Sequence, residues 1–149
     1  MLGLPMTPSP TYLFVYGTLR CGAGVPMAGM LARQARWLGT RTMRGHLYRI
    51  ADYPGFIPDE DGEDVTGDLF ALYDPETTLS ALDDYEECSV RFPAPHEYRR
   101  VMLPVASVDG CVAAWTYVYT QPVHPDMLIA GGDFLADRPM TKGTEGEKT

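Results

Sequence analysis

The sequence has little of what disulfide-bonded, zinc-binding or membrane-inserted proteins need. It holds three cysteines, an odd number and widely spaced, and three histidines without a metal-ligand spacing. An even disulfide framework and a zinc site are therefore not expected, and the cysteine usage favours a reducing, cytoplasmic location. The start has no basic signal-peptide region, and no apolar run approaches the roughly 20 residues of a membrane helix. We expect no metal, no cofactor and no membrane association.

Positive charge is also scarce. The chain has 12 Lys and Arg residues against 20 Asp and Glu residues, which gives a formal net charge of −8, and its basic residues are scattered. Nucleic acids and anionic membranes both need a concentrated basic surface, so neither is an expected partner. A small molecule is the expected ligand, and an anionic group on it would be held locally by backbone N–H groups or one arginine. The sequence does not indicate an oligomeric state.

A length of 149 residues fits one domain with a core of its own. Residues 1–10 contain three prolines and are predicted to be a loose lead-in, residues 11–136 the domain, and residues 137–149 a polar tail. One helix is predicted to begin at Pro26 and to end at Gly39, with Leu38 on its apolar face.

A second helix and several strands complete the predicted fold. Asp74 and Pro75 have the residue types of a helix N-cap and first position, and the helix is predicted to run to about Glu87. The strands are predicted over residues 11–16, 41–50, 65–73, 98–108 and 111–121, with a turn-rich segment over 52–64 and an Asp-Gly hairpin loop at 109–110. This pattern predicts an α+β domain whose sheet curls into a small mixed β-barrel with flanking helices.

Glu86 is the candidate catalytic residue that the helical pattern identifies. With a 100° turn per residue, Glu86 falls on the inward stripe that Leu79 and Leu82 define, because it lies seven and four residues after them. A buried glutamate is unfavourable unless it is paired or neutral, and the last turn of a helix also disfavours negative charge. Both effects raise the pKa of a carboxyl group toward neutrality, where it can take and give a proton.

The alternative is an ordinary structural role for Glu86. It would then form an ion pair with Arg99 or Arg100 at the edge of the core, as boundary glutamates often do. The pattern of residues alone does not choose between the two roles.

The turn formed by Tyr16, Gly17, Thr18 and Leu19 is the candidate binding element. A strand that runs straight into glycine and threonine presents successive backbone N–H groups at the end of a sheet, and glycine lets a ligand approach the main chain. Such amides suit a carboxylate or a developing oxyanion. A plain turn with a structural glycine explains the same residues.

These residues resemble the γ-glutamylcyclotransferase-like family. Two motifs carry the resemblance: the YGTL turn at 16–19, which is typical of the γ-glutamylamine cyclotransferase branch, and Leu82-Asp83-Asp84-Tyr85-Glu86 at a helix end. Further matches follow in the family's order between residues 11 and 135, at 44–48, 53–55, 65–70, 98–101, 115–119 and 132–134. Two departures concern substrate choice: Glu87 stands where the family usually has glycine, and the segment 89–97 is longer than in many members.

The resemblance implies a cofactor-independent enzyme that closes a γ-glutamyl group into 5-oxoproline and releases an amine or amino acid. Glu86 would be the general acid and base, and residues 16–19 would hold the substrate. Tyr98 and Tyr119 are predicted to line the cavity, as is Tyr117, although tyrosines in strands often serve packing alone. A non-catalytic module that binds a γ-glutamyl-like metabolite, or a tailoring enzyme that removes a γ-glutamyl protecting group, would share the same residues.

Arg20 and the cysteines have weaker cases for a role in the site. Arg20 could meet an anionic substrate, although a lone arginine after a turn is usually solvated. A thiol nucleophile at Cys21 or Cys88 lacks a partnering histidine motif, and an isolated thiol near neutral pH is mostly protonated. Cys111, at the start of a strand, is expected to be packed.

Overall fold

The computed structural model describes residues 10–20, 26–107 and 110–136, so the lead-in up to residue 9, Cys21 and the tail from residue 137 lie outside the described residues. Six strands form one sheet in the order β3-β2-β4-β1-β6-β5. The strands are β1 (Thr11–Val15), β2 (Ala35–Arg49), β3 (Pro54–Pro58), β4 (Glu63–Leu72), β5 (Tyr98–Ser107) and β6 (Gly110–Tyr119). The helices are α1 (Pro26–Gln34), α2 (Pro75–Tyr85) and the 3-10 turn η1 (Pro125–Met127).

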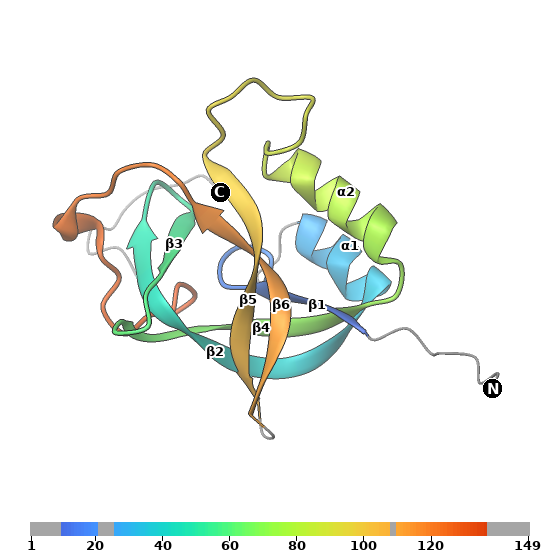
Figure 1. Ribbon diagram of the computed structural model, residues 1–149, viewed down its shortest axis with the longest axis horizontal. Coiled ribbons are helices and arrows are strands. Elements are labelled where there is room, and N and C mark those ends of the chain that lie inside the picture. Colours follow the sequence, from blue (N-terminus) through green and yellow to red (C-terminus); the bar gives the residue numbers. More distant parts are fainter. Residues whose placement is uncertain (1–9, 21–25, 108–109, 137–149) are drawn as a thin grey trace, which may run out of the picture.

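The sheet is mixed and strongly curled. All neighbouring strands pair antiparallel except β1 and β6, which run parallel. The curl brings β3 near β6 and β2 near β5 (Figure 1), which makes a half-barrel, with α1 and α2 together at one side. The predicted fold class, a curled mixed sheet with flanking helices, is confirmed.

Strand β1 lies at the centre because both of its faces are buried. Successive side chains of a strand point to opposite faces. Leu13 and Val15 therefore join one apolar cluster, with Leu31 of α1 and Leu82 of α2. Phe14 and Tyr16 join the other, inside the curl, with Leu47 of β2, Phe56 of β3 and Val105 of β5. A strand buried on both faces has a continuous apolar sequence, as residues 11–16 do.

The first helix and the segment after it differ from prediction. Helix α1 ends at Gln34, and Leu38 lies in β2 rather than on a helical face. Gly39 has a φ of 117° and marks a register shift between Trp37 and Gly39, which is a β-bulge. A glycine of positive φ serves a bulge as well as a helix C-terminus, so the same residue type allowed both interpretations.

The segment predicted to be turn-rich contains β3. Its five residues begin and end with Pro54 and Pro58, and the strand pairs only with β2 at the edge of the sheet. Proline lacks the N–H that a central strand needs, which confines proline-bearing strands to edges. The other predicted strands and the hairpin loop agree with β2, β4, β5 and β6, although residue 109 of that loop lies outside the described residues.

Helix α2 begins and ends with capping motifs. The Asp74 carboxylate accepts a hydrogen bond from the Thr77 N–H at 3.4 Å, and Pro75 follows as predicted. At the other end, the Cys88 N–H donates to the Asp83 carbonyl at 2.9 Å and the Glu87 N–H to the Asp84 carbonyl at 3.1 Å. These two bonds form a Schellman motif, whose left-handed position is occupied by Glu87 with a φ of 59°.

Replacing Glu87 by glycine is expected to stabilise the protein by about 1 kcal/mol, because a left-handed residue with a side chain costs about 1–2 kcal/mol relative to glycine. Urea unfolding measures the change. Glu87→Ala is the matched control, since it removes the same charge but keeps the Cβ atom. Equal free energies of unfolding for the glycine and alanine variants would contradict this interpretation.

Candidate active site

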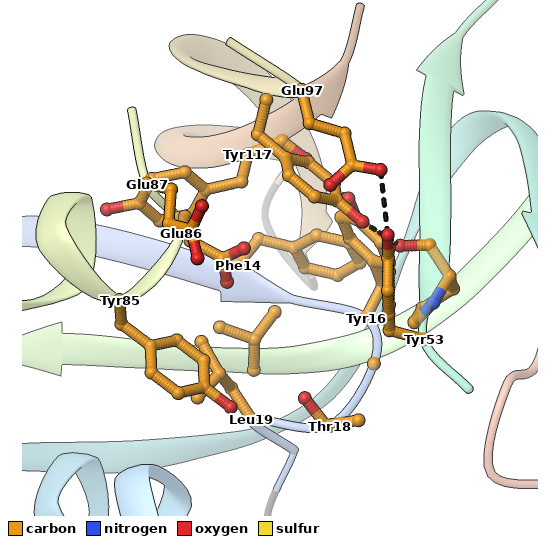
Figure 2. Close-up of a pocket in the computed structure, with 14 residues that line it drawn as sticks. Phe14, Tyr16, Thr18, Leu19, Tyr53, Tyr85, Glu86, Glu87, Glu97 and Tyr117 are labelled. Atoms are coloured by element: carbon orange, nitrogen blue, oxygen red, sulfur yellow. Dashed lines mark hydrogen bonds between the residues drawn. The ribbon is translucent and has the colours of Figure 1, made fainter. Parts of the chain in front are cut away.

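A pocket of about 370 Å³ opens where the turn after β1, the end of α2 and the start of β5 meet (Figure 2). This volume is within the range of small-molecule sites. Its described lining residues are Phe14, Val15, Tyr16, Gly17, Thr18, Leu19, Tyr53, Pro54, Tyr85, Glu86, Glu87, Glu97, Tyr98 and Tyr117.

Glu86 directs its carboxyl group into this pocket from the C-cap of α2 (Figure 2). It follows the buried Leu79 and Leu82 on the inward stripe, as the helical pattern predicts. Within the described residues, no hydrogen bond or ion pair holds its carboxylate. Burial of the carboxyl group, with smaller contributions from the negative charges of Glu97 and Glu87, raises the pKa of Glu86 from 4.5 to about 7. The residue as a whole is half-buried and lines the pocket, so a ligand bound there can reach it.

The arginine that might have paired with Glu86 pairs instead with Asp83, one turn earlier. Arg100 donates from Nε to Asp83 Oδ1 at 2.7 Å and from Nη2 to Oδ2 at 2.9 Å. The Tyr117 hydroxyl donates to the same Oδ1 at 2.7 Å. Arg99, the other candidate, is exposed. Asp83 thus takes up the available cation and leaves Glu86 unpaired.

The turn after β1 is held by an internal backbone hydrogen bond and by ion pairs of Arg20. The Arg20 N–H donates to the Gly17 carbonyl at 3.1 Å, while no backbone hydrogen bond within the described chain uses the N–H groups of Thr18 and Leu19. The buried Arg20 guanidinium binds Asp133 at 2.9 Å and lies 3.6 Å from Asp68. Arg20 therefore holds the turn in place and does not line the pocket, unlike the role predicted for it with an anionic substrate.

Gly17 is required by the close approach of Pro54. A Cβ atom on Gly17 would lie 2.5 Å from Pro54 Cγ, which is far inside van der Waals contact. Pro54 is in turn fixed by its carbonyl, which accepts a hydrogen bond from the Tyr98 hydroxyl at 2.6 Å. The Tyr16 hydroxyl donates to the Tyr117 carbonyl at 2.5 Å. The aromatic walls of the pocket are thus tied to backbone atoms of other segments.

The structure brings most of the predicted site residues together, with one exception. Glu86, the 16–19 turn, Tyr98 and Tyr117 all line the pocket. Tyr119 is not among its described lining residues. Its ring packs edge-on against Tyr98 at a centroid distance of 5.6 Å, and it occupies the space beside Gly55. Tyr119 therefore supports Tyr98 from behind.

Glu97 and Tyr53 are pocket residues that sequence reasoning missed. Glu97 comes just before β5 and accepts a hydrogen bond from the Tyr53 hydroxyl at 2.7 Å. Tyr53 belongs to the motif at residues 53–55, whose only signal in the sequence is the family resemblance. Glu97 belongs to the unusually long segment 89–97, and nothing in its local sequence indicates that it reaches the same pocket as Glu86.

The cysteines do not contribute to this pocket within the described residues. Burial and the negative charge of Asp83 raise the pKa of the Cys88 thiol to about 11, which disfavours a thiolate. Cys111 is exposed, so the prediction that it is packed is wrong. The described residues also contain no group of three or more His, Cys, Asp or Glu side chains that could hold a metal ion. In the same residues, every helix is too short or too polar to cross a membrane.

Comparison with known proteins identifies relatives over nearly the whole domain. The family model described as gamma-glutamyl cyclotransferase, AIG2-like, matches residues 13–136. An AIG2-like protein from Mus musculus is similar in structure, with a TM-score of 0.67 and 22% identity over 93% of this chain and 99% of the mouse protein. The protein ytfP from Escherichia coli has a TM-score of 0.58 and 32% identity over 85% of this chain and 97% of ytfP.

A third similar structure is YkqA from Bacillus subtilis, with a TM-score of 0.63 and 20% identity over 85% of this chain. This chain spans 40% of the length of YkqA. Among curated proteins, none matches the chain.

The raised pKa of Glu86 predicts a pH-dependent stability. The folded value of about 7 exceeds the unfolded value, so the proton stabilises the folded state at low pH and this contribution is lost as the pH rises from about 4.5 through about 7. Glu86→Gln should raise the free energy of unfolding by less than about 1 kcal/mol near pH 5 and by up to about 3 kcal/mol near pH 8. Urea unfolding at both pH values measures this, with the exposed Glu60→Gln as control. A pH dependence that is the same in all three proteins would contradict the assignment.

Proposed function

The chain belongs to the gamma-glutamyl cyclotransferase, AIG2-like family, and from this premise we propose that it cyclises a γ-glutamyl group to 5-oxoproline and releases an amine. The observation that supports the proposal most directly is the Glu86 carboxyl group inside the pocket, which has a pKa of about 7 and no hydrogen-bond or ion-pair partner among the described residues. The proposed site comprises Glu86, the turn at residues 16–19 and Tyr98.

The proposed reaction is an intramolecular acyl transfer. The α-amino nitrogen of the substrate attacks its own γ-carbonyl carbon, a carbon–nitrogen bond forms to close the five-membered ring, and the bond to the leaving nitrogen breaks. No electrons are transferred and no water is consumed. A pocket that holds the substrate chain folded back supplies much of the acceleration, since well-oriented intramolecular reactions reach effective molarities of about 10⁵ M or more.

Glu86 would move the two protons that the reaction requires. The attacking nitrogen must lose one proton before it attacks and a second as the ring closes, and the leaving nitrogen gains one before it departs and the other as the free amine becomes an ammonium ion. A carboxylate that accepts the first proton can donate it in the second step, which conserves the proton and returns the enzyme to its starting state. A pKa near neutrality suits both directions, whereas an ordinary glutamate would be a weak base.

The amides of the turn would hold the anionic part of the substrate. The described lining residues of the pocket include no Lys, Arg or His, so an anion there depends on N–H and hydroxyl donors. The N–H groups of Thr18 and Leu19 are unused by the described backbone and belong to the pocket-lining turn. They suit the substrate α-carboxylate or the oxyanion that forms at the γ-carbonyl.

Glu86→Gln should fold and bind substrate but reduce 5-oxoproline release by about 10²–10⁴-fold, because it removes the group that transfers protons. Mass spectrometry of 5-oxoproline from γ-glutamylamines, γ-glutamyl amino acids and glutathione measures the product, and calorimetry measures binding. Glu76→Gln, an exposed substitution on the same helix, is the control. Binding without product by the wild-type protein would identify a non-catalytic module, and turnover retained in Glu86→Gln would remove Glu86 from the mechanism.

The pH profile of the wild-type enzyme follows from the ionisation of Glu86. Only the carboxylate form can accept the α-ammonium proton, so kcat/KM should fall about tenfold per pH unit below an apparent pKa of about 7. A profile over the acidic range measures this limb. A kcat/KM that stays constant down to about pH 5 would mean that the proton is accepted by a group with an ordinary carboxyl pKa.

A further inference from the structure

The ionisable side chains with a charge near neutral pH that line the pocket are all acidic. Glu86, Glu87 and Glu97 contribute three carboxyl groups, and the described lining residues include no Lys, Arg or His. The proposed γ-glutamyl substrate brings one ammonium group, which is the nucleophile that meets Glu86. The other two carboxylates have no counterpart in the γ-glutamyl group, whose remaining charge is negative.

Glu97 is the carboxylate that is built into the pocket. Its Oε2 atom accepts a hydrogen bond from the Tyr53 hydroxyl at 2.7 Å, which fixes the orientation of the group (Figure 2). Within the described residues it forms no ion pair. The aromatic rings of Tyr53 and Tyr98 lie beside it, with their centroids 6.3 Å apart. Glu87, by contrast, is exposed, so solvent screens its charge.

The position of Glu97 matches the path of the departing amine. Figure 2 shows Thr18 and Leu19 at the bottom of the view, Glu86 above them at the left and Glu97 at the upper right. A substrate that places its anionic part on the turn and its reacting centre at Glu86 can extend its amine portion toward Glu97 and Tyr53, which line the same pocket. The group it meets there is an oriented carboxylate with aromatic neighbours.

This environment is complementary to a cation. Burial is the main cause of the raised pKa of Glu86, Tyr53 and Tyr98, and the negative charge of Glu97 raises the pKa of each further. A positive charge beside Glu97 would offset this repulsion and gain a charge-assisted hydrogen bond. The tyrosine rings add cation–π attraction for an ammonium group. A second anion or an apolar chain end gains none of these interactions.

We propose that Glu97 is a specificity-determining residue that selects γ-glutamyl substrates whose departing amine keeps a second ammonium group, such as a mono-γ-glutamylated diamine. The inference rests on the proposed cyclotransferase function. Tyr53 is the positioning residue, because its hydroxyl holds Glu97 in place.

Two nearly isosteric substrates test the inference. Mono-γ-glutamyl cadaverine and γ-glutamyl-n-hexylamide differ only in an ammonium or a methyl group at the far end of the amine. The assay at about pH 8.5 keeps Glu86 ionised in all variants, while an alkylammonium group of pKa about 10.4 keeps its proton. Wild-type kcat/KM should favour the cadaverine substrate by about tenfold or more at low salt, and the preference should shrink as ionic strength rises.

The variants separate Glu97 from the general negative charge of the protein. Glu97→Gln should bring the ratio of the two kcat/KM values below about threefold, and Tyr53→Phe should reduce it partly. Glu60→Gln removes one negative charge from an exposed loop and is the matched control, with the ratio of the wild-type protein expected. Nε-γ-glutamyl-lysine adds only a carboxylate to the cadaverine substrate, so it should be the poorer substrate of that pair.

The outcomes distinguish the inference from the function on which it rests. Product from both amides with a wild-type ratio near one, or a cationic preference that survives Glu97→Gln, overturns the role of Glu97 while cyclotransferase activity stands. Absence of 5-oxoproline from every γ-glutamyl substrate overturns the proposed function and the inference together. A preference that is lost in Glu97→Gln and kept in Glu60→Gln supports both.

Discussion

The bidentate ion pair between Asp83 and Arg100 holds the end of α2 against β5, and the state of Glu86 depends on it. Asp83 accepts both guanidinium hydrogen bonds and the Tyr117 hydroxyl of β6. Arg100 also stacks over the Trp115 ring at 4.4 Å. The last turn of the helix is thus fixed to two strands, and the cation that would have neutralised Glu86 is already taken. Glu86 lies one turn further along the helix, and its carboxyl group points into the pocket.

The pocket is assembled by hydrogen bonds to backbone atoms rather than by the sheet alone. Tyr98 holds the Pro54 carbonyl and Tyr16 holds the Tyr117 carbonyl, so each aromatic wall is fixed to a segment far away in the chain. Gly17 allows Pro54 to approach the turn. Such cross-links position side chains without the motion of long surface loops, which suits a reaction whose rate depends on holding a substrate folded.

Charge sets the chemical character of the site. Within its described lining residues the pocket combines acidic groups, tyrosine rings and backbone amides, without a basic side chain. Because no cation among these described residues offsets it, burial raises the pKa of Glu86 to about 7. The same arrangement that makes Glu86 a base near neutral pH therefore also makes the pocket favourable for positively charged ligands, and the proposed activity and the proposed selectivity have one electrostatic origin.

Features that depend on neighbouring residues could be predicted before the fold was known. The apolar strand at residues 11–16, the Asp74-Pro75 helix start and the stripe of Leu79, Leu82 and Glu86 all follow from local periodicity and capping, and the structure has each of them. The bulge at Gly39 and strand β3 were missed, since their local signals also fit a helix end and a turn.

Which charged side chains form pairs depends on the packing of the whole fold. From the sequence, Arg99 and Arg100 were both possible partners for Glu86. In the structure, Arg100 pairs with Asp83, 17 residues away. It also brought Glu97 to Tyr53, 44 residues away, and so into the pocket. Ion pairs of this kind depend on how strands and helices pack, and that packing places residues together which no periodicity or spacing relates.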